Sequence, residues 1–351
     1  MTAGRVYLDH NASSPLRPEA REAMLRVMGM RGNPSSIHAE GRALKGEIER
    51  ARRSAAKLVG AEPRQVFFTS GATEAANWAL DRDVRPLASE HPCVLENASP
   101  EVIAVRADGT PDGGTFDVAA VQIANSETGV LPGAYGQALA DAVQAVGRVS
   151  VDFRAGGYGA MIVSSHKIGG PSGAGALVVR DPDDPPAPLL RGGGQEKRRR
   201  AGTENVVAIA GFGAAAAAAL RDLDDMPRIE AMRDRLEAGL HDLSVKWGAK
   251  LHIFGQDAPR LPNTSCFAVE GLDAQTMLMS LDLEGFAVSS GSACSSGKVG
   301  PSHVLKAMGV GDDVARCALR VSLGWTNEND DVPAFLAAFE RIGERAFQRA
   351  A

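Results

Sequence analysis

The sequence has 351 residues, enough for one large domain or two smaller ones, and its 44% hydrophobic and 23% charged residues are typical of a folded globular protein. A formal net charge of −5 at pH 7 gives no reason to expect nucleic acid or an anionic membrane surface as a partner. No signal peptide or membrane-spanning stretch is recognised, and the four cysteines are scattered, so we expect a cytoplasmic protein without a disulfide framework or a metal site.

Hydrophobic periodicity predicts the elements of the first two thirds of the chain. Helices are expected over 18–28, with proline in the first turn, and over 39–59, where apolar residues recur at helical spacing. A buried strand over 65–69 leads through a tight turn into another helix. Short apolar segments between turns and helical pieces indicate a mixed or mostly parallel sheet. They cover 93–95, 102–105, 120–124, 148–151, 160–163 and 175–179.

The pattern changes towards the C-terminus. A loop over 181–188 precedes a long helical stretch over 204–243 with a break near Pro227. From residue 248 onward, short strands alternate with helices; the strands are expected at 251–254, 264–269, 286–289 and 318–323, and the helices at 273–283, 301–308 and 330–349. We therefore predict a large domain over 16–247 and a small α+β domain made of 1–15 with 248–351.

Residues that could bind a ligand or take part in a reaction follow three of the expected strands. Lys167 follows an apolar strand and precedes a glycine-rich turn; an amine held there can form a Schiff base, although a lysine pointing into solvent is the ordinary alternative. Residues 69–74 form a strand, a turn and a helix start, where backbone amides and the Thr73 hydroxyl can bind an anion. Asp152 ends the strand expected at 148–151 and could face a pyridine nitrogen. A phosphate cradle, a carboxylate and a lysine are the groups that a pyridoxal phosphate enzyme needs.

Ordered motifs along nearly the whole chain resemble the class V aminotransferases and, within them, the cysteine desulfurases of the NifS/IscS type. The matching segments are 6–12, 32–38, 69–74, 90–92, 125–129, 164–170, 192–196, 201–205, 289–294 and 319–324. The resemblance implies a fold type I pyridoxal phosphate-dependent transferase, with a mostly parallel seven-stranded sheet between helices and a smaller α+β domain.

The resemblance also implies roles for single residues. Lys167 would hold the cofactor aldehyde, Asp152 would pair with the pyridinium nitrogen, and His91 would stack on the ring and move protons. Thr203 would reach the phosphate in the partner subunit of a homodimer. The remaining implied roles are phosphate binding for Ala72, Thr73, Ser164 and His166, a place near the cofactor and the substrate for Asn125, and substrate binding for Asn11 and Arg320.

Cys294 indicates the reaction type. It lies in a serine- and glycine-rich segment, 289–297, whose composition is typical of an exposed loop. The match to the SSGSAC loop of group I desulfurases implies that Cys294 takes sulfur from L-cysteine as a persulfide, releases L-alanine and passes the sulfur to an acceptor protein, by default for iron–sulfur cluster assembly. Cys93, Cys266 and Cys317 lie in apolar contexts and are expected to pack in the core.

The sequence departs from the family pattern in two ways. The family aspartate is usually followed by Ala-x-Gln, whereas Ala155 stands three residues after Asp152. The intervals 74–90 and 152–167 are short, which indicates a shortened variant.

Other functions stay open at this point. Within pyridoxal phosphate chemistry they are a class V aminotransferase, an epimerase, a selenocysteine lyase, or a low-activity desulfurase that needs a partner. Outside it, a non-enzymatic sulfur carrier could use residues 196–200 for docking. The loop around Cys294 favours desulfuration, and the lysine argues against a pure platform.

Overall fold

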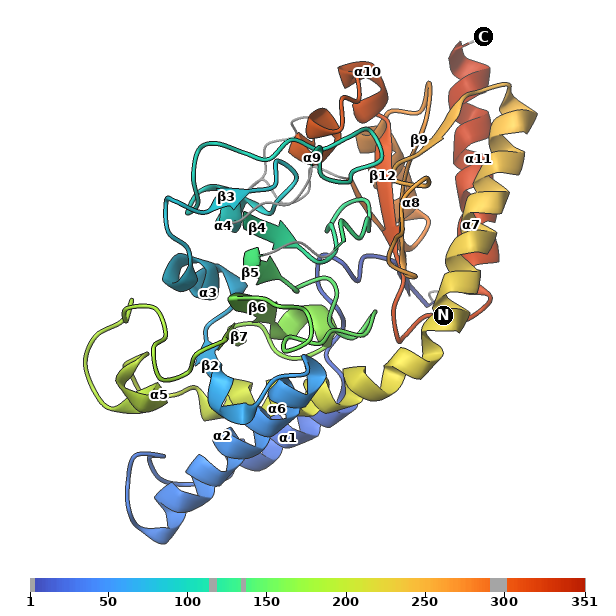
Figure 1. The fold of residues 1–351 in the computed structure, drawn as a ribbon. Helices are drawn as coiled ribbons and strands as arrows, with labels where there is room; N and C mark the ends of the chain where they lie inside the picture. Colours follow the sequence, from blue (N-terminus) through green and yellow to red (C-terminus); the bar gives the residue numbers. More distant parts are fainter. Residues whose placement is uncertain (1–3, 114–118, 134–136, 291–301, 351) are drawn as a thin grey trace.

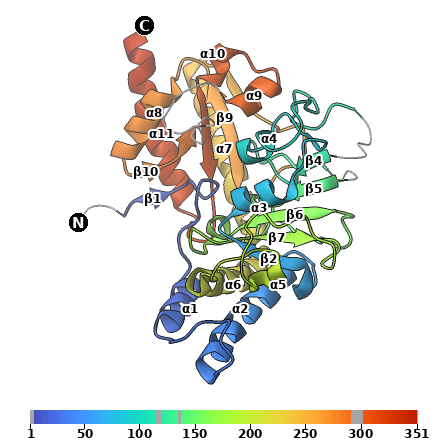
Figure 2. The ribbon, with the colours of Figure 1, turned by 90° about the vertical axis from the view of Figure 1, so that its left-hand side faces the viewer.

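The computed structural model describes residues 4–113, 119–133, 137–290 and 302–350. A six-stranded sheet with helices on both faces forms one part of the molecule, and a four-stranded sheet with its own helices forms the other (Figures 1 and 2). The α/β class predicted from the sequence is confirmed.

The large sheet is mixed. Its strand order is β2-β7-β6-β5-β4-β3, and β7 runs antiparallel to both of its neighbours while the pairs β6–β5, β5–β4 and β4–β3 are parallel. The described residues give six strands where seven were expected; a single parallel bridge between Leu87 and Ile103 extends the sheet beyond β3. The strands are β2 (Val66–Thr69), β3 (Arg85–Pro86), β4 (Ala119–Gln122), β5 (Gln137–Asp141), β6 (Ala160–Ser164) and β7 (Gly175–Val179).

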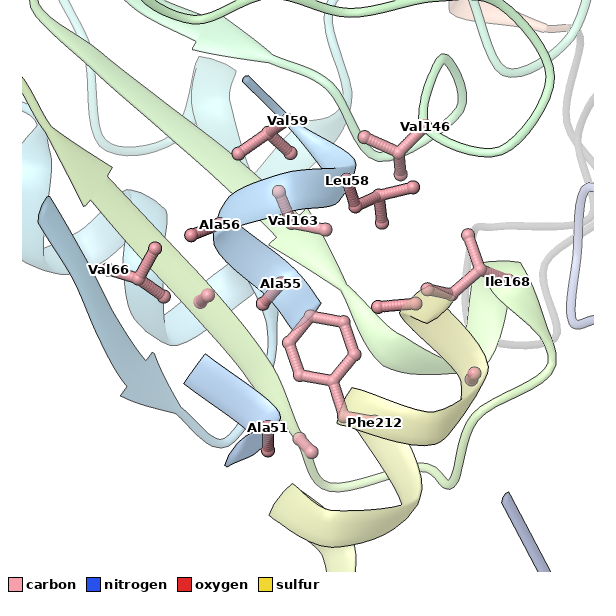
Figure 3. Close-up of a cluster of buried hydrophobic side chains, with 14 of the residues drawn as sticks. Ala51, Ala55, Ala56, Leu58, Val59, Val66, Val146, Val163, Ile168 and Phe212 are labelled. Atoms are coloured by element: carbon pink, nitrogen blue, oxygen red, sulfur yellow. The ribbon is translucent and has the colours of Figure 1, made fainter. Parts of the chain in front are cut away.

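One face of this sheet is covered by α1 (Pro18–Met28), α2 (Ala39–Leu58) and α6 (Val206–Arg221). Phe212 of α6 points between α2 and the sheet, among Ala51, Ala55 and Val163 (Figure 3). Gly213 lets α6 approach α2 closely, since a Cβ there would lie 2.4 Å from the Cα atom of Ala51. Successive side chains along β2, β6 and β7 point to opposite faces of the sheet. The hydrophobic ones on one face therefore pack in this core, and the others pack in the core on the opposite face.

The opposite face packs against α3 (Ala72–Ala79) and α4 (Pro92–Leu95). The strand predicted at 93–95 was wrong, because this segment is the short helix α4. Pro92 stands in its first turn, and the His91 side chain accepts a hydrogen bond from the Cys93 amide as an N-cap. Local helix-start signals outweighed the apolar character of the segment.

The second part of the molecule contains the sheet β11-β12-β9-β8, in which all pairs are antiparallel. Its core includes side chains of α7, which runs beside α11 (Figure 1), so this core begins before residue 248. The N-terminal strand β1 pairs with β10, in line with the prediction that residues 1–15 belong with the C-terminal region. The boundary between the two domains stays a prediction. The strands are β1 (Val6–Tyr7), β8 (Leu251–Ile253), β9 (Thr264–Val269), β10 (Phe286–Ala287), β11 (Ser289–Ser290) and β12 (Ala318–Ser322). The helices are α7 (Met226–Trp247), α8 (Ala274–Leu283), α9 (His303–Ala307), α10 (Asp312–Ala315) and α11 (Asp331–Ala350).

One helical stretch, residues 206–247, is long and apolar enough in composition to cross a membrane, although no membrane-spanning stretch is expected from the sequence. It comprises α6, a 3₁₀ turn over Asp222–Asp225 and α7. Of its most apolar window, 61% is buried inside the protein. Burial of α6 against α2 and the sheet accounts for its apolar composition, as in the core helix of a globular domain.

Candidate active site

A cavity of about 380 Å³ lies where the carboxyl ends of β4, β5 and β6 meet the start of α3 and the strand β12. In an α/β sheet, ligands bind at this edge. Many of the side chains predicted to act together line it, although they are far apart in the sequence. These are Asn11, Ala72, Thr73, His91, Ser164, His166, Lys167 and Arg320.

The first turn of α3 forms one wall of the cavity. The amides of Ala72 and Thr73 have no acceptor within the helix because they belong to its first turn, so they are free for an anion. Gly175 of β7 lies directly behind this turn, and a Cβ there would meet the Cα atom of Gly71 at 2.6 Å. Glycine at 175 is therefore required for the strand to support the turn so closely. This cradle fits a phosphate group.

Lys167 reaches the cavity from a short 3₁₀ helix, Ser165–Ile168, that follows β6. Its Nζ atom donates hydrogen bonds to the backbone oxygens of Asn11, at 2.6 Å, and Ala12, at 2.8 Å. The lysine is thus held by the N-terminal segment, with its amine inside the cavity. The alternative of a solvent-facing lysine at a strand end is excluded.

The carboxylate predicted to face the ring was assigned to the wrong residue. Asp152 is exposed, lies in a turn and accepts hydrogen bonds from the amides of Arg154 and Ala155, both at 3.0 Å. Residues 148–151 form no strand; the strand beside β6 is β5, and it ends at Asp141. Asp141 is buried and lines the cavity. The weakly apolar run 137–140 had concealed this strand.

The glutamine that seemed to be missing is also present. Gln144 stands three residues after Asp141 and lines the cavity, so the run Asp141-Ala142-Val143-Gln144 matches the Ala-x-Gln pattern. Its Nε2 atom donates to the backbone oxygen of Asn11 at 3.0 Å, and Arg148 donates to its Oε1 atom. Neither Ala155 nor a short interval before Lys167 therefore sets this chain apart from the family pattern. The sequence therefore contains the motif at Asp141, but the apolar run Val149-Ser150-Val151 favours a strand that ends at Asp152 instead.

A second buried carboxyl group, Glu90, lies close to Asp141. Its Oε1 atom accepts a hydrogen bond from the amide of Gln122, the residue that pairs with Asp141 between β4 and β5. Burial raises the pKa of both carboxyl groups, and the positive charge of Lys167 lowers that of Asp141 in compensation. We expect the proton to stay on Glu90 and the negative charge on Asp141.

The two histidines of the cavity are neutral near pH 7. Burial, assisted by the charge of Lys167, lowers the pKa of both His91 and His166 to about 4. A neutral imidazole can accept a proton or stack on a flat ring without adding charge. His91 and His166 are both suited to the roles expected of them.

Arg320 offers a site for a carboxylate from the other side of the cavity. Its Nη2 atom lies 2.8 Å from Oδ1 of Asp9, and its Nη1 atom donates to the backbone oxygen of Ser126 at 3.0 Å. The Nε atom is buried and has no hydrogen-bond partner. A buried donor of this kind favours binding of an anionic group.

Besides Asp152, two predicted side chains do not line the cavity. The Oδ1 atom of Asn125 accepts hydrogen bonds from the amides of Glu127 and Thr128, both at 2.9 Å, so it shapes the turn behind the cavity. Thr203 is exposed on the segment between α5 (Gln195–Arg198) and α6. Its predicted contact with a partner subunit stays a prediction.

Cys294 lies outside the described residues, but the positions that flank its segment are described. Ser289 pairs with Arg320 across β11 and β12, so the chain leaves the sheet beside the cavity. Ser302 caps α9, and its hydroxyl donates to the buried carboxyl group of Glu127. Among the other cysteines, Cys266 and Cys93 are buried in hydrophobic cores as expected, and Cys317 is half-buried against one of them. Cys93 also lines the cavity wall. Burial raises the pKa of the Cys93 thiol to about 12, so it stays protonated.

Glu127 makes stability depend on pH. Burial raises its pKa to about 7, above its ordinary value of 4.5. The folded protein keeps the proton of Glu127 at pH values where the unfolded chain has lost it. The stabilisation is therefore complete below about pH 4.5, and the free energy of unfolding falls by up to about 3 kcal/mol as the pH rises through about 7. We expect Glu127→Gln to gain stability over the wild type between about pH 5 and about pH 8, measured as the free energy of unfolding in urea. Glu22→Gln, on an exposed side chain of α1, serves as the control and should follow the wild-type curve. Equal pH dependence of the wild type and Glu127→Gln would contradict this assignment.

The segment after Gly194 is strained. Three consecutive residues other than glycine have positive φ values, 43° at Glu196, 57° at Lys197 and 66° at Arg198. Arg198→Gly should stabilise the protein by roughly 0.5–1 kcal/mol, because the left-handed strain removed exceeds the added entropy of the unfolded chain. Arg191→Gly, at an exposed position with no positive φ recorded, should be neutral or destabilising. Thermal unfolding of both variants tests this expectation, and a destabilised Arg198→Gly would contradict it.

The chain was compared with known proteins. The aminotransferase class-V family model matches residues 6–98 and 97–335. This chain belongs to the class-V aminotransferase family. It is 38% identical to the IscS-like cysteine desulfurase of Mycobacterium tuberculosis, over 97% of either chain, and 35% identical to the cysteine desulfurase IscS of Methanosarcina thermophila, over 97% of this chain and 92% of that one.

Solved structures agree with this chain in fold. A NifS-like protein from Rickettsia africae superposes with a TM-score of 0.84 at 32% identity, covering 97% of this chain and 99% of its own. SspA in complex with cysteine superposes with a TM-score of 0.74 at 25% identity, covering 91% of this chain and 98% of its own. The resemblance found in the sequence is thereby confirmed.

This class-V aminotransferase family member is short. The alignment to the Mycobacterium tuberculosis relative is 389 residues long, more than the 351 residues of this chain, so relatives carry segments that it lacks. One short connection joins the parallel strands β4 and β5, where a helix is usual; its described residues, 123–133, contain no helix. This connection leads into β5, the strand that carries Asp141, and the cavity lining is in place.

Proposed function

We propose that the protein is a cysteine desulfurase that uses pyridoxal 5′-phosphate, converts L-cysteine to L-alanine and takes the sulfur on Cys294. The observation that carries the proposal is the convergence of Lys167, Asp141 and the first turn of α3 on one cavity that also contains Arg320. Relatives named cysteine desulfurase, 35–40% identical over most of the chain, support the choice of reaction.

The cavity fits the cofactor in chemistry. The amides of Ala72 and Thr73, with Ser164 and the neutral His166, would hold the phosphate. Asp141 would hold the pyridine nitrogen in its protonated form, and Gln144 would take the role at the phenolic oxygen that its motif implies. When bound, the cofactor supplies the electron sink that lets a proton leave the Cα atom of an amino acid.

The side chains of this protein would perform the remaining tasks. Arg320 would bind the substrate carboxylate through its unpartnered Nε atom. The Nζ atom of Lys167, close to the backbone oxygens of Asn11 and Ala12, would move the Cα proton. His91 would accept or return a proton as a neutral imidazole.

Sulfur transfer is assigned to Cys294. Its thiolate would attack the substrate sulfur, forming an S–S bond while the Cβ–S bond breaks, and the carbon fragment would take up protons and leave as alanine. The persulfide would then pass to an acceptor protein. We further propose a cytoplasmic homodimer in which Thr203 reaches the partner's site, with iron–sulfur cluster assembly as the default destination of the sulfur.

The test is incubation of the purified protein with pyridoxal phosphate, L-cysteine and a reductant, followed by quantification of alanine and sulfide. Stoichiometric alanine and sulfide support the proposal. Amino-group transfer to a 2-oxo acid without sulfide would establish an aminotransferase instead. A preference for L-selenocysteine with little turnover of L-cysteine would establish a selenocysteine lyase.

A further inference from the structure

We propose that Arg200 is a positioning residue for the cofactor phosphate, because it neutralises the charge of Glu74 next to the phosphate site. The Arg52–Glu196 ion pair holds the segment that carries Arg200 in place. The inference deepens the proposed function and rests on it. It concerns residues that lie around the anion cradle and that the mechanism above does not use.

Glu74 is an obstacle to anion binding if its charge is uncompensated. It lies in the first turn of α3, lines the cavity beside Thr73, and its Oε2 atom accepts a hydrogen bond from the Ser70 amide at 2.8 Å. This bond shapes the phosphate turn. The same carboxylate, 14% exposed, would repel a phosphate dianion at the neighbouring amides.

Arg200 compensates that charge with a two-point contact. Its Nε atom lies 2.9 Å from Oε1 of Glu74, and its Nη2 atom lies 3.2 Å from Oε2. Burial would raise the pKa of Glu74, but the hydrogen bonds from Arg200 and Ser70 hold it below its ordinary value. Glu74 therefore stays ionised for its structural bond while Arg200 cancels its field at the phosphate site.

A second ion pair fixes the segment that presents Arg200. Arg52 of α2 meets Glu196 with its two terminal nitrogens at 2.8 and 2.7 Å. The Oε2 atom of Glu196 also accepts the amide of Phe68 on β2, at 2.9 Å, the strand that leads into the phosphate turn. Both side chains are almost completely buried. Fixed interactions of this kind are needed to keep three residues in left-handed conformation.

The segment is closed by a further contact, because the amide of Gly202 donates to the Oε1 atom of Gln195 at 3.2 Å. The phosphate turn and residues 195–202 thus form one hydrogen-bonded unit. Thr203 follows directly after it, so the same unit that tunes this protomer's phosphate site presents the residue proposed to reach the partner's site.

The proposal predicts an effect that depends on the phosphate group. Arg200→Met leaves Glu74 uncompensated, and we expect it to weaken binding of pyridoxal phosphate to the apoprotein roughly tenfold. Binding of pyridoxal, which has no phosphate, should stay within about twofold of the wild type. Glu74→Gln should bind pyridoxal phosphate as tightly as the wild type or more tightly, since the repelling charge is gone and Arg200 remains. The double variant should recover most of the affinity lost in Arg200→Met.

The experiment measures dissociation constants of the apoprotein for both aldehydes by absorbance titration, with thermal unfolding as the check on folding. Arg221→Met, which removes an exposed ion pair with Glu19, is the matched control and should behave as the wild type. Equal losses for pyridoxal phosphate and pyridoxal, or a loss in Glu74→Gln, would overturn the inference in favour of a purely structural role. If Arg200→Met does not fold, the affinity of Glu74→Gln for pyridoxal phosphate decides: an equal or higher affinity than the wild type supports the inference, and a lower affinity contradicts it. Failure of the wild type to bind pyridoxal phosphate would instead reject the proposed function.

Discussion

Asp141→Asn is expected to lower the turnover of L-cysteine at least about 100-fold, whereas Asp152→Asn should stay within about twofold of the wild type. Asp141 is a buried carboxylate at the carboxyl end of β5, in the same cavity as Lys167. An amide cannot hold a pyridine nitrogen in its protonated form, so the electron sink is weakened. Asp152 is exposed in a turn outside the cavity lining.

The measurement is the rate of alanine release with saturating cofactor, together with the absorbance spectrum of the bound cofactor. Asp141→Asn should bind the cofactor with an altered spectrum, because the charge next to the ring is changed. If Asp152→Asn instead lost activity and Asp141→Asn kept it, the assignment of the carboxylate from the structure would be wrong. Folding of both variants is checked by their thermal unfolding.

Cys294→Ser is expected to abolish persulfide formation and to lower alanine production by at least about 100-fold, while cofactor binding is retained. A serine hydroxyl is a far weaker nucleophile toward sulfur than a thiolate. Cys93, the thiol at the cavity wall, cannot take over, because burial keeps it protonated. β11, the strand that precedes the segment containing Cys294, pairs Ser289 with Arg320, the residue proposed to bind the substrate carboxylate.

Persulfide is measured by alkylation and mass spectrometry of the intact protein after exposure to L-cysteine. Cys317→Ser is the matched control, because its half-buried thiol contacts the backbone oxygen of Asp313 outside the cavity. The control should give wild-type persulfide and alanine. Unchanged alanine release by Cys294→Ser would reject Cys294 as the sulfur acceptor and leave an aminotransferase-type or lyase-type reaction as the better explanation.

Two kinds of functional residue were predictable from the sequence to different degrees. Lys167, Thr73 and Arg320 stand in compact motifs whose order along the chain is itself informative, and all three line the cavity. Glu74 belongs to one of these motifs, but its partner Arg200 lies in a basic run that reads as a solvated loop. An ion pair between residues so far apart in sequence has no local signal.

The sequence by itself determined the class of fold, most helices and the family, because hydrophobic periodicity and local motifs are properties of neighbouring residues. The helix over 18–28 and the strand over 264–269 have the bounds that were predicted. The Ala-x-Gln motif after Asp141 is present in the sequence, but only the tertiary structure showed that Asp141, and not Asp152, lines the cavity. Val149–Val151 is as apolar as a strand, whereas β5 is weakly apolar and is stabilised by pairing with β4 and β6 on both sides. Strand pairing depends on residues distant in the chain, so the sheet, and not local propensity, placed Asp141 beside Lys167.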